Sequence, residues 1–396
     1  MIIKQKTAWK EAAWIFGLSR LMILLFSYLA VKFFLILPPP GFMMYIGPKN
    51  CINNIMCFLL SWWRWDAVHY VQIAYGGYSR TMLTVFFPLF PLLIHSVGFL
   101  LGGSIIADYA AGLILANSSF YGVLVLFYHL VSKDFGHRVA KYALVYLAFA
   151  PYAIFFFVGY SESLFLLLTL AAFLFLRRGK PLDWWLAGLC GFLAVLTRPT
   201  GIILVIPFLS LFMEKFGIHT LLARENWWEK LNALFPIVLI PAGLLTYMLY
   251  QWMAFGNPWL FTVEEVHVWH RSLSFPWVGF FTAIREVATG EQLLSRWNLR
   301  DTVFTVLPLV ALILGWKRLS LHYRLFSLTM ILSLLCEPAQ KLGLMSVPRF
   351  LLVVFPIFLL FALWSKHRSI AWNLLIPSVI FFAVHSMQLA LYSWIA

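Results

Sequence analysis

The chain has 396 residues, of which 62% are hydrophobic and only 11% are charged, whereas about a quarter of a soluble domain is charged. Apolar runs of about 18 residues or more, each long enough to cross a bilayer, recur along the chain. These features exclude a soluble enzyme and predict one all-α, polytopic membrane domain over residues 1–396. The net charge of +14 does not indicate nucleic-acid binding, because the basic residues form short clusters between apolar runs, where they contact anionic membrane lipids.

The first predicted element is an uncleaved membrane-spanning helix at 11–37. Its apolar part is longer than the core of a signal peptide, and no A-x-A-like site follows it. The positive-inside rule assigns the N-terminus and six basic clusters to the cytoplasm. These clusters lie at 4–10, 133–141, 177–180, 215–230, 317–324 and 366–368.

The apolar segment 82–103 is predicted not to cross. If this segment and the next one, 105–132, both crossed, the basic cluster at 133–141 would lie on the external side. Every later basic cluster would then also be external, which contradicts the positive-inside rule. Segment 82–103 contains FFPLFP, and Pro88 and Pro91 break helical hydrogen bonds. We therefore expect it to pack on protein or to line a cavity at membrane depth.

Eleven crossings result, with the C-terminus outside. They are predicted at 11–37, 105–132, 139–158, 162–178, 184–197, 200–216, 231–252, 302–316, 324–338, 349–365 and 370–393. Two long connections, 38–104 with interfacial helices and 253–301, are then external. The membrane is the bacterial plasma membrane or the endoplasmic reticulum, and the oligomeric state is not predicted.

The four cysteines do not indicate zinc, because no Cys/His spacing is suitable. Cys51 and Cys57 share one polar loop. They fit a disulfide if that loop is external, and two free thiols equally well. Cys190 and Cys336 lie in apolar runs and are expected in the core.

Asp66 is the strongest candidate for chemistry. It stands in WWRWDAVHYVQIAYGGYS, where helical spacings relate Trp62, Trp65, His69 and Tyr70 and fit a short interfacial helix. Aromatic walls raise the basicity of a carboxylate, which suits a general base. An aromatic anchor in the interface with one solvated acid fits the residue types equally well.

Three further charged residues stand where predicted spans meet external loops. Glu162, in FVGYSESLF, is either a capping acid at the positive end of a helix or a hydrogen-bonding partner of a polyol. Arg198, in AVLTRPTGI, and Arg349, in MSVPRFLLVVFP, either snorkel to headgroups or bind a phosphate.

The segment EEVHVWH holds Glu264, Glu265, His267 and His270. It has the residue types of a metal site, but it is not HExxH and has no clear helical pattern, so a solvated loop or contacts with a polar substrate are expected and no metal. The absence of a P-loop, GxGxxG and GxSxG leaves nucleotide binding and a serine hydrolase without support.

Four motifs follow one another in a recognisable order: RWDAVHYVQIAYGGYS, FFPLFPLL, APYAIFFFVGYSESLF and LAVLTRPTGI. Over roughly 60–205 this order resembles the PIG-V family of mannosyltransferases, with SVPRFLLVVFP as a weaker match beyond. The resemblance implies a GT-C glycosyltransferase fold that uses a polyprenyl-phosphate-linked sugar on the extracytoplasmic or lumenal side. Asp66 matches the catalytic acid expected in the first external loop. The GPI acceptor does not carry over, because prokaryotic relatives have no GPI pathway.

The expected reaction needs a base and cations. A polyprenyl phosphate leaves as an anion, so cations suffice to stabilise it, while the acceptor hydroxyl must lose a proton. Asp66 is predicted to be that base, with inversion at the sugar, and Arg198 and Arg349 to bind the phosphate. Seven further residues are assigned to the sugar or the acceptor: Arg64, Trp65, His69, Tyr70, Tyr78, Tyr160 and Glu162.

The donor is a co-substrate, so no cofactor is expected, and a divalent metal is compatible with the site but not required. The acceptor is a glycolipid, a glycan or a protein. A transporter or flippase is the alternative function. It would place ionisable residues at mid-bilayer and gates on both sides, whereas here the spans hold few charges, such as Arg20, Lys32 and Asp108.

Overall fold

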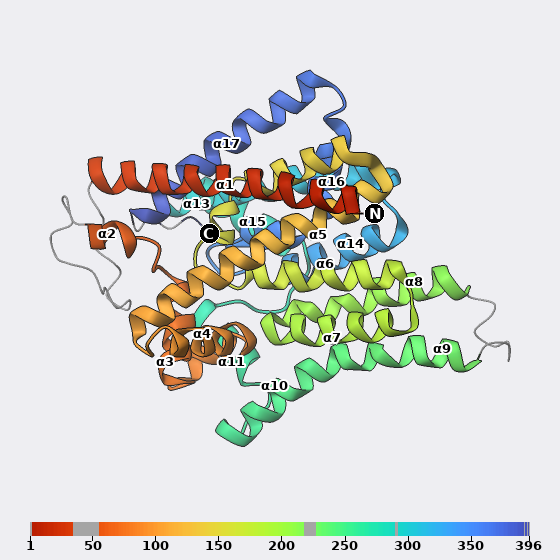
Figure 1. Ribbon diagram of the computed structural model, residues 1–396. Helices are drawn as coiled ribbons and strands as arrows, with labels where there is room; N and C mark the ends of the chain where they lie inside the picture. Colours follow the sequence, from red (N-terminus) through yellow and green to blue (C-terminus); the bar gives the residue numbers. More distant parts are fainter. Residues whose placement is uncertain are drawn as a thin grey trace. The chain divides into compact units, whose positions relative to one another are not determined.

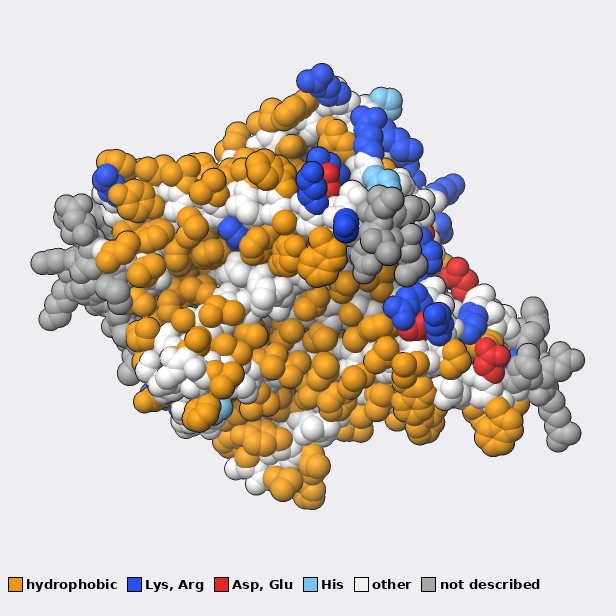
Figure 2. Space-filling model, in the orientation of Figure 1, with side chains coloured by type: hydrophobic (Ala, Val, Ile, Leu, Met, Phe, Trp, Pro, Cys, Tyr) orange, Lys and Arg blue, Asp and Glu red, His pale blue; other side chains and the backbone are white. Residues whose placement is uncertain are grey.

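The computed structural model describes residues 2–34, 55–217, 227–289 and 292–391, together with 393 and 395. Across these ranges the regular elements are helices, accompanied by one isolated antiparallel bridge between Arg271 and Ala339. The predicted all-α fold is confirmed. Apolar side chains cover most of the face seen in Figure 2, as expected of a protein whose surroundings are lipid.

The chain divides into two compact units. The first unit comprises Met1–Ser79, Pro91–Ser163 and Phe358–Ala396, and the second comprises Arg80–Phe90 and Leu164–Ile357.

The first unit is built on α1 (Ile2–Phe33), which packs along both α5 (Ile105–Ala148) and α17 (Arg368–Ala390) (Figure 1). Two short helices, α2 (Ile55–Leu59) and α3 (Asp66–Gly76), follow the first span, and α3 packs against α5. A 3-10 turn, η2 (Ala153–Phe156), lies between α5 and α6 (Glu162–Arg178).

Arg20 anchors α1 to the segment around η2. Its guanidinium is buried and donates to the carbonyl of Phe156 at 3.1 Å. It also lies 4.5 Å from the ring centre of Phe120 and 4.9 Å from that of Phe16. A cation inside a span is expensive, and these aromatic faces offset part of that cost.

Helix α5 covers the predicted crossing 105–132 and the first part of the predicted crossing 139–158. It is interrupted at Gly136, whose φ of 83° and ψ of 170° are not helical. This break lies within the basic cluster 133–141, so the predicted change of direction is a kink inside one long element. Helix α5 ends at Ala148, ten residues before the predicted boundary at 158.

The second unit holds most of the remaining helices. They are α7 (Pro181–Thr197), η3 (Pro199–Leu204), α8 (Val205–Phe216), α9 (Trp227–Leu234), η5 (Phe235–Val238), α10 (Leu239–Phe255), α11 (Leu260–Trp269), α12 (Val278–Thr289), α13 (Gln292–Gly315), η6 (Trp316–Arg318), α14 (Leu321–Leu335), α15 (Val347–Phe350) and η7 (Leu351–Val353). Helix α16 (Pro356–Trp364) starts in the second unit, and its residues from Phe358 onward belong to the first.

Helices α7 and α10 approach closely through glycines. A Cβ atom added to Gly243 of α10 would lie 2.6 Å from the carbonyl oxygen of Phe192 and 3.1 Å from Cβ of Val195. Small residues allow such close backbone approach between membrane helices.

Six helical stretches among the described residues are long and apolar enough to cross a membrane, or seven if a bent pair forms one span. They are Lys6–Phe33, Ile105–Ala148, Pro199–Phe216, Trp227–Phe255, Leu294–Arg318 and Arg368–Ala390, and the bent pair is Val347–Val353 with Pro356–Trp364, at 81°. The predicted count of eleven is not confirmed, because helices such as α7 and α14 are shorter than a span.

Segment 82–103 forms η1 (Thr81–Val85) and α4 (Leu89–Leu100). Helix α4 has 12 residues and is therefore about 18 Å long at 1.5 Å per residue, against a hydrocarbon core of about 30 Å. It is too short to cross, in agreement with the prediction from charge.

The expectation that EEVHVWH has no helical pattern is wrong, because residues 264–269 lie in α11. Helix α12 and the start of α13 occupy much of the remaining connection 253–301. Burial of Leu260 and Ala283 holds these helices in place. Among the described residues no group of three or more His, Cys, Asp or Glu side chains is suited to a metal. Cys190 and Cys336 are half-buried free thiols. Cys51 and the side chain of Cys57 lie outside the described residues.

Candidate active site

Asp66 is half-buried and is the first residue of α3. Its backbone N–H donates to the hydroxyl of Tyr160 at 3.2 Å, and that hydroxyl donates to the carbonyl of Arg64, also at 3.2 Å. Tyr160 is 1% exposed. The start of α3 is thus fixed to the segment that precedes α6.

A second contact joins the same two segments. The hydroxyl of Tyr70 lies 2.8 Å from Oγ of Ser161, and the next residue, Glu162, is fully buried at the start of α6. The structure therefore brings Asp66, Tyr70, Tyr160 and Glu162 into one neighbourhood of the first unit. A carboxylate in the first turn of α6 is favoured by the positive end of that helix.

Tryptophans hold the chain that leads to Asp66. Nε1 of Trp62 donates to Oγ of Ser27 on α1 at 3.1 Å, and the Trp62 ring lies 4.9 Å from that of Phe157, edge to face. The Trp63 ring stacks on Tyr109 of α5 at 5.0 Å. Both indoles are buried, so these aromatics serve as structural supports rather than as an exposed interface belt.

The other predicted substrate residues of this unit vary in exposure. Arg64 and His69 are buried; Arg64 donates to the carbonyl of Trp63 at 3.4 Å, and Nδ1 of His69 lies 3.3 Å from Oε1 of Gln72. Trp65 and Tyr78 are half-buried. Contact of these residues with sugar or acceptor stays a prediction.

A cluster of three arginines forms in the second unit around the ring of Phe350. The guanidinium carbons of Arg198, Arg349 and Arg271 lie 4.8, 5.2 and 5.3 Å from its centre. Arg198 follows α7 and precedes Pro199, and Arg349 is buried in α15. The structure thus brings together the two arginines that the sequence singled out, and adds a third.

None of the sequence motifs assigns a role to Arg271. It follows α11, where His270 takes a left-handed conformation with φ of 52°. Its position depends on a distant segment, since Arg271 pairs with Ala339 and its Nη2 donates to the carbonyl of Met345 at 2.6 Å. A short motif contains no sign of such a pairing.

Two carboxylates interact electrostatically with Arg271. Oε1 of Glu265 lies 3.7 Å from its Nη1. Burial raises the pKa of the Glu337 carboxyl, and the positive charge of Arg271 opposes that rise. The planar guanidinium groups of the cluster match the oxygens of a phosphate.

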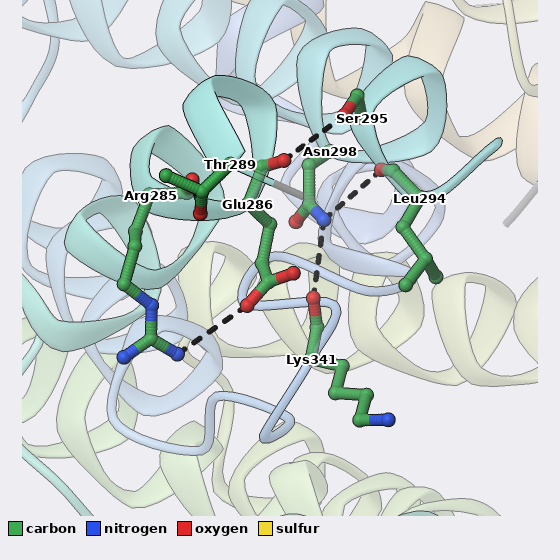
Figure 3. A network of polar contacts seen from close by, with 7 residues as sticks. All are labelled: Arg285, Glu286, Thr289, Leu294, Ser295, Asn298 and Lys341. Carbon is green, nitrogen blue, oxygen red and sulfur yellow. Dashed lines mark hydrogen bonds and ion pairs between the residues drawn. The ribbon is translucent and has the colours of Figure 1, made fainter. Parts of the chain in front are cut away.

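A polar network holds the segment between α14 and α15 in place (Figure 3). Nδ2 of the buried Asn298 donates to the carbonyls of Leu294 and Lys341, both at 3.1 Å. Oγ of Ser295 donates to the carbonyl of Glu286 at 2.9 Å, joining α13 to α12. The loop that accepts from Arg271 is therefore tied to α13 as well.

Known proteins share stretches of this sequence. The chain is 34% identical over 155 residues to GPI alpha-1,6-mannosyltransferase 2 of Cricetulus griseus, and 26% identical over 153 residues to GPI mannosyltransferase 2 of Schizosaccharomyces pombe. The matches cover 36% and 38% of this chain, but only 30% and 32% of those relatives.

Solved structures share the fold. ArnT from Cupriavidus metallidurans bound to undecaprenyl phosphate is similar with a TM-score of 0.51 at 12% identity, over 96% of this chain and 76% of that chain. At that identity the likeness shows the fold alone, that of a GT-C membrane glycosyltransferase. With its apolar helices, the chain is a multi-pass integral membrane protein. Residues 18–389 match the family model described as Mannosyltransferase (PIG-V), and the chain therefore belongs to the PIG-V mannosyltransferase family.

Proposed function

We propose that the protein transfers mannose from a polyprenyl-phosphate-linked donor to a hydroxyl of a lipid-linked, glycan or protein acceptor, on the extracytoplasmic side and with inversion. The observation that carries this proposal is the fixed placement of Asp66 at the start of α3, through its backbone bond to Tyr160. A carboxylate held in this way, in a chain of a mannosyltransferase family, is suited to act as a base.

The reaction needs one proton transfer. The acceptor oxygen attacks the anomeric carbon on the face opposite the phosphate, and its proton passes to the Asp66 carboxylate. The bond from the anomeric carbon to the phosphate oxygen breaks, and its electron pair stays on the phosphate. A positioned general base contributes about 10²–10⁴-fold to such a step.

The arginine cluster is proposed to bind the donor phosphate. Bidentate contacts from guanidinium groups stabilise the charge that the leaving phosphate gains, and the shared ring of Phe350 orients the three groups. The polyprenyl phosphate named in the ArnT structure supports a donor of that class. This chemistry requires no cofactor.

The side of the membrane and the acceptor are inferred from charge and from family names. Basic clusters belong in the cytoplasm, which places Asp66 and Glu162 on the opposite side. The curated relatives are named for GPI mannose transfer, which supports a membrane glycolipid among the acceptor classes. Tyr70 and Glu162 are proposed to hydrogen-bond sugar hydroxyls.

The test is label transfer in lipid nanodiscs, with radiolabelled polyprenyl-phosphate mannose and a membrane lipid and protein extract. The wild type and the control Glu11→Gln, which removes an ion pair with Lys141, should both label a product. Asp66→Asn should fold and bind donor but lose transfer by about 10²-fold or more. Full activity of Asp66→Asn would contradict the base assignment. Movement of donor across proteoliposomes without label transfer would instead support the transporter alternative.

A further inference from the structure

The chain makes a strained tight turn just before Asp66. Trp65 has φ of 50° and ψ of −125°, the conformation of the first central residue of a type II′ turn. The N–H of Ala67 donates to the carbonyl of Arg64 at 3.0 Å, which is the hydrogen bond that closes such a turn. This position normally takes glycine, because a Cβ atom is crowded at positive φ.

A tryptophan in this conformation persists only if its surroundings impose it. The hydroxyl of Tyr160 does so from one side, since it donates to the carbonyl of Arg64 and accepts from the N–H of Asp66. These two groups flank Trp65. One hydroxyl therefore bridges the two ends of the strained peptide.

The incoming chain is held from two other directions. Trp62 is bonded to Ser27 of α1, and Trp63 is stacked on Tyr109 of α5. With these two indoles fixed, the backbone reaches Arg64 in a defined direction. The remaining freedom lies at Trp65, where the Tyr160 hydroxyl acts.

We propose that Tyr160 is a positioning residue, which holds Trp65 in its positive-φ conformation and thereby sets the direction in which α3 presents the Asp66 carboxylate. The Tyr160 hydroxyl donates a hydrogen bond to the backbone carbonyl of Arg64 and accepts one from the backbone N–H of Asp66. With a side chain that is 1% exposed, Tyr160 acts through Asp66 rather than on the sugar. This inference rests on the proposed function of Asp66 as the base.

The experiment compares Tyr160→Phe with Tyr146→Phe in the label-transfer assay. Tyr146 is a matched control, because its buried hydroxyl also makes two hydrogen bonds, to Ser365 and to the carbonyl of Ala371. We expect kcat of Tyr160→Phe to fall about tenfold or more while KM for the donor stays within about threefold. Tyr146→Phe should keep both values close to the wild type, even where its melting temperature falls.

A second pair of variants isolates the backbone. Trp65→Gly and Trp65→Ala both remove the indole, but only glycine adopts φ of 50° without crowding. In the Tyr160→Phe background, Trp65→Gly should therefore turn over several-fold faster than Trp65→Ala. In the wild-type background, Trp65→Gly should have the higher melting temperature of the two.

The results separate two failures. An active wild type, an inactive Asp66→Asn and a fully active Tyr160→Phe would overturn the positioning role while leaving the proposed function intact. A raised KM with unchanged kcat in Tyr160→Phe would indicate direct substrate binding instead of positioning. Equal turnover of Trp65→Gly and Trp65→Ala in the Tyr160→Phe background would also overturn the positioning role. A wild type that transfers no label would remove the proposed function, and this inference with it.

Discussion

Nη2 of Arg20 donates to the carbonyl oxygen of Phe156 at 3.1 Å, joining the first helix of the chain to the turn before α6. The same guanidinium lies against the rings of Phe16 and Phe120. A planar cation makes all three contacts at once. An ammonium group, with one compact charge, does not.

Arg20→Lys should therefore destabilise the protein more than Arg20→Met. Lysine keeps a buried charge and loses the aromatic and carbonyl contacts, at a cost of about 1–3 kcal/mol, whereas methionine removes the charge together with its desolvation penalty. Chemical or thermal unfolding in detergent measures the order. Lys32→Met, at an exposed position of the same helix, serves as the control and should change stability little. Greater stability of the lysine variant would contradict this account.

Replacement of Arg271 by glutamine should weaken donor binding. It removes one of three guanidinium groups around Phe350, and the loss of one charged hydrogen-bonding partner corresponds to about tenfold in the dissociation constant. Binding of polyprenyl-phosphate mannose to the protein in nanodiscs measures this affinity. Arg285→Gln is the matched control, since Arg285 is exposed and paired with Glu286. Equal effects of the two substitutions would place the phosphate elsewhere.

Donor affinity should increase as the pH falls through the pKa of Glu337. That pKa is raised by burial despite the nearby Arg271, so the carboxylate becomes neutral above the pH at which an ordinary glutamate does. Its protonation leaves the charge of Arg271 less compensated, while the donor, a phosphodiester, keeps its charge. The folded state also binds this proton more tightly than the unfolded chain, so the contribution of Glu337 to stability is lost as the pH rises through the raised pKa.

The pH effect is isolated by Glu337→Gln. His270 and Glu265 also lie beside Arg271, but they are unchanged in the variant. Glu337→Gln should bind donor more tightly than the wild type at neutral pH, and the two should converge at low pH. The dissociation constant measured from pH 4 to 8 tests this, and parallel curves for both proteins would refute it.

Gly243→Val should destabilise the second unit. Its Cβ would enter the space held by the Phe192 carbonyl and Val195, so α7 and α10 would have to separate, at about 1–3 kcal/mol. Gly17→Ala is the control, because nothing lies within 4 Å of a Cβ there and alanine favours the helix by up to about 1 kcal/mol. Melting temperatures should move in opposite directions.

Several elements were predictable because their signals are local. Charge alternation and two prolines identified 82–103 as a segment that does not cross, and a basic cluster located the break in α5. Composition sufficed for the all-α fold. The motifs around Asp66, Glu162, Arg198 and Arg349 selected positions that the structure places in two clusters, one in each unit.

The remainder depends on contacts between distant parts of the chain. Helix α11 packs on η1, and α12 packs through Gly279 on Gly343 of the segment before α15. Arg271, which lies against the ring of Phe350, pairs with the distant Ala339 and donates to the carbonyl of Met345. The strain at Trp65 runs against local preference, which would place glycine there, so no propensity could have predicted it.

The exposed break at Gly136 offers a way to determine the orientation of the protein in its membrane. A Cβ at Gly136 would meet nothing within 4 Å, and its neighbours Lys133, Asp134, His137 and Arg138 are exposed. A short epitope inserted there should leave the packing of α5 intact. Antibody access to that epitope in sealed vesicles, compared with permeabilised ones, would report on which side of the membrane Gly136 lies.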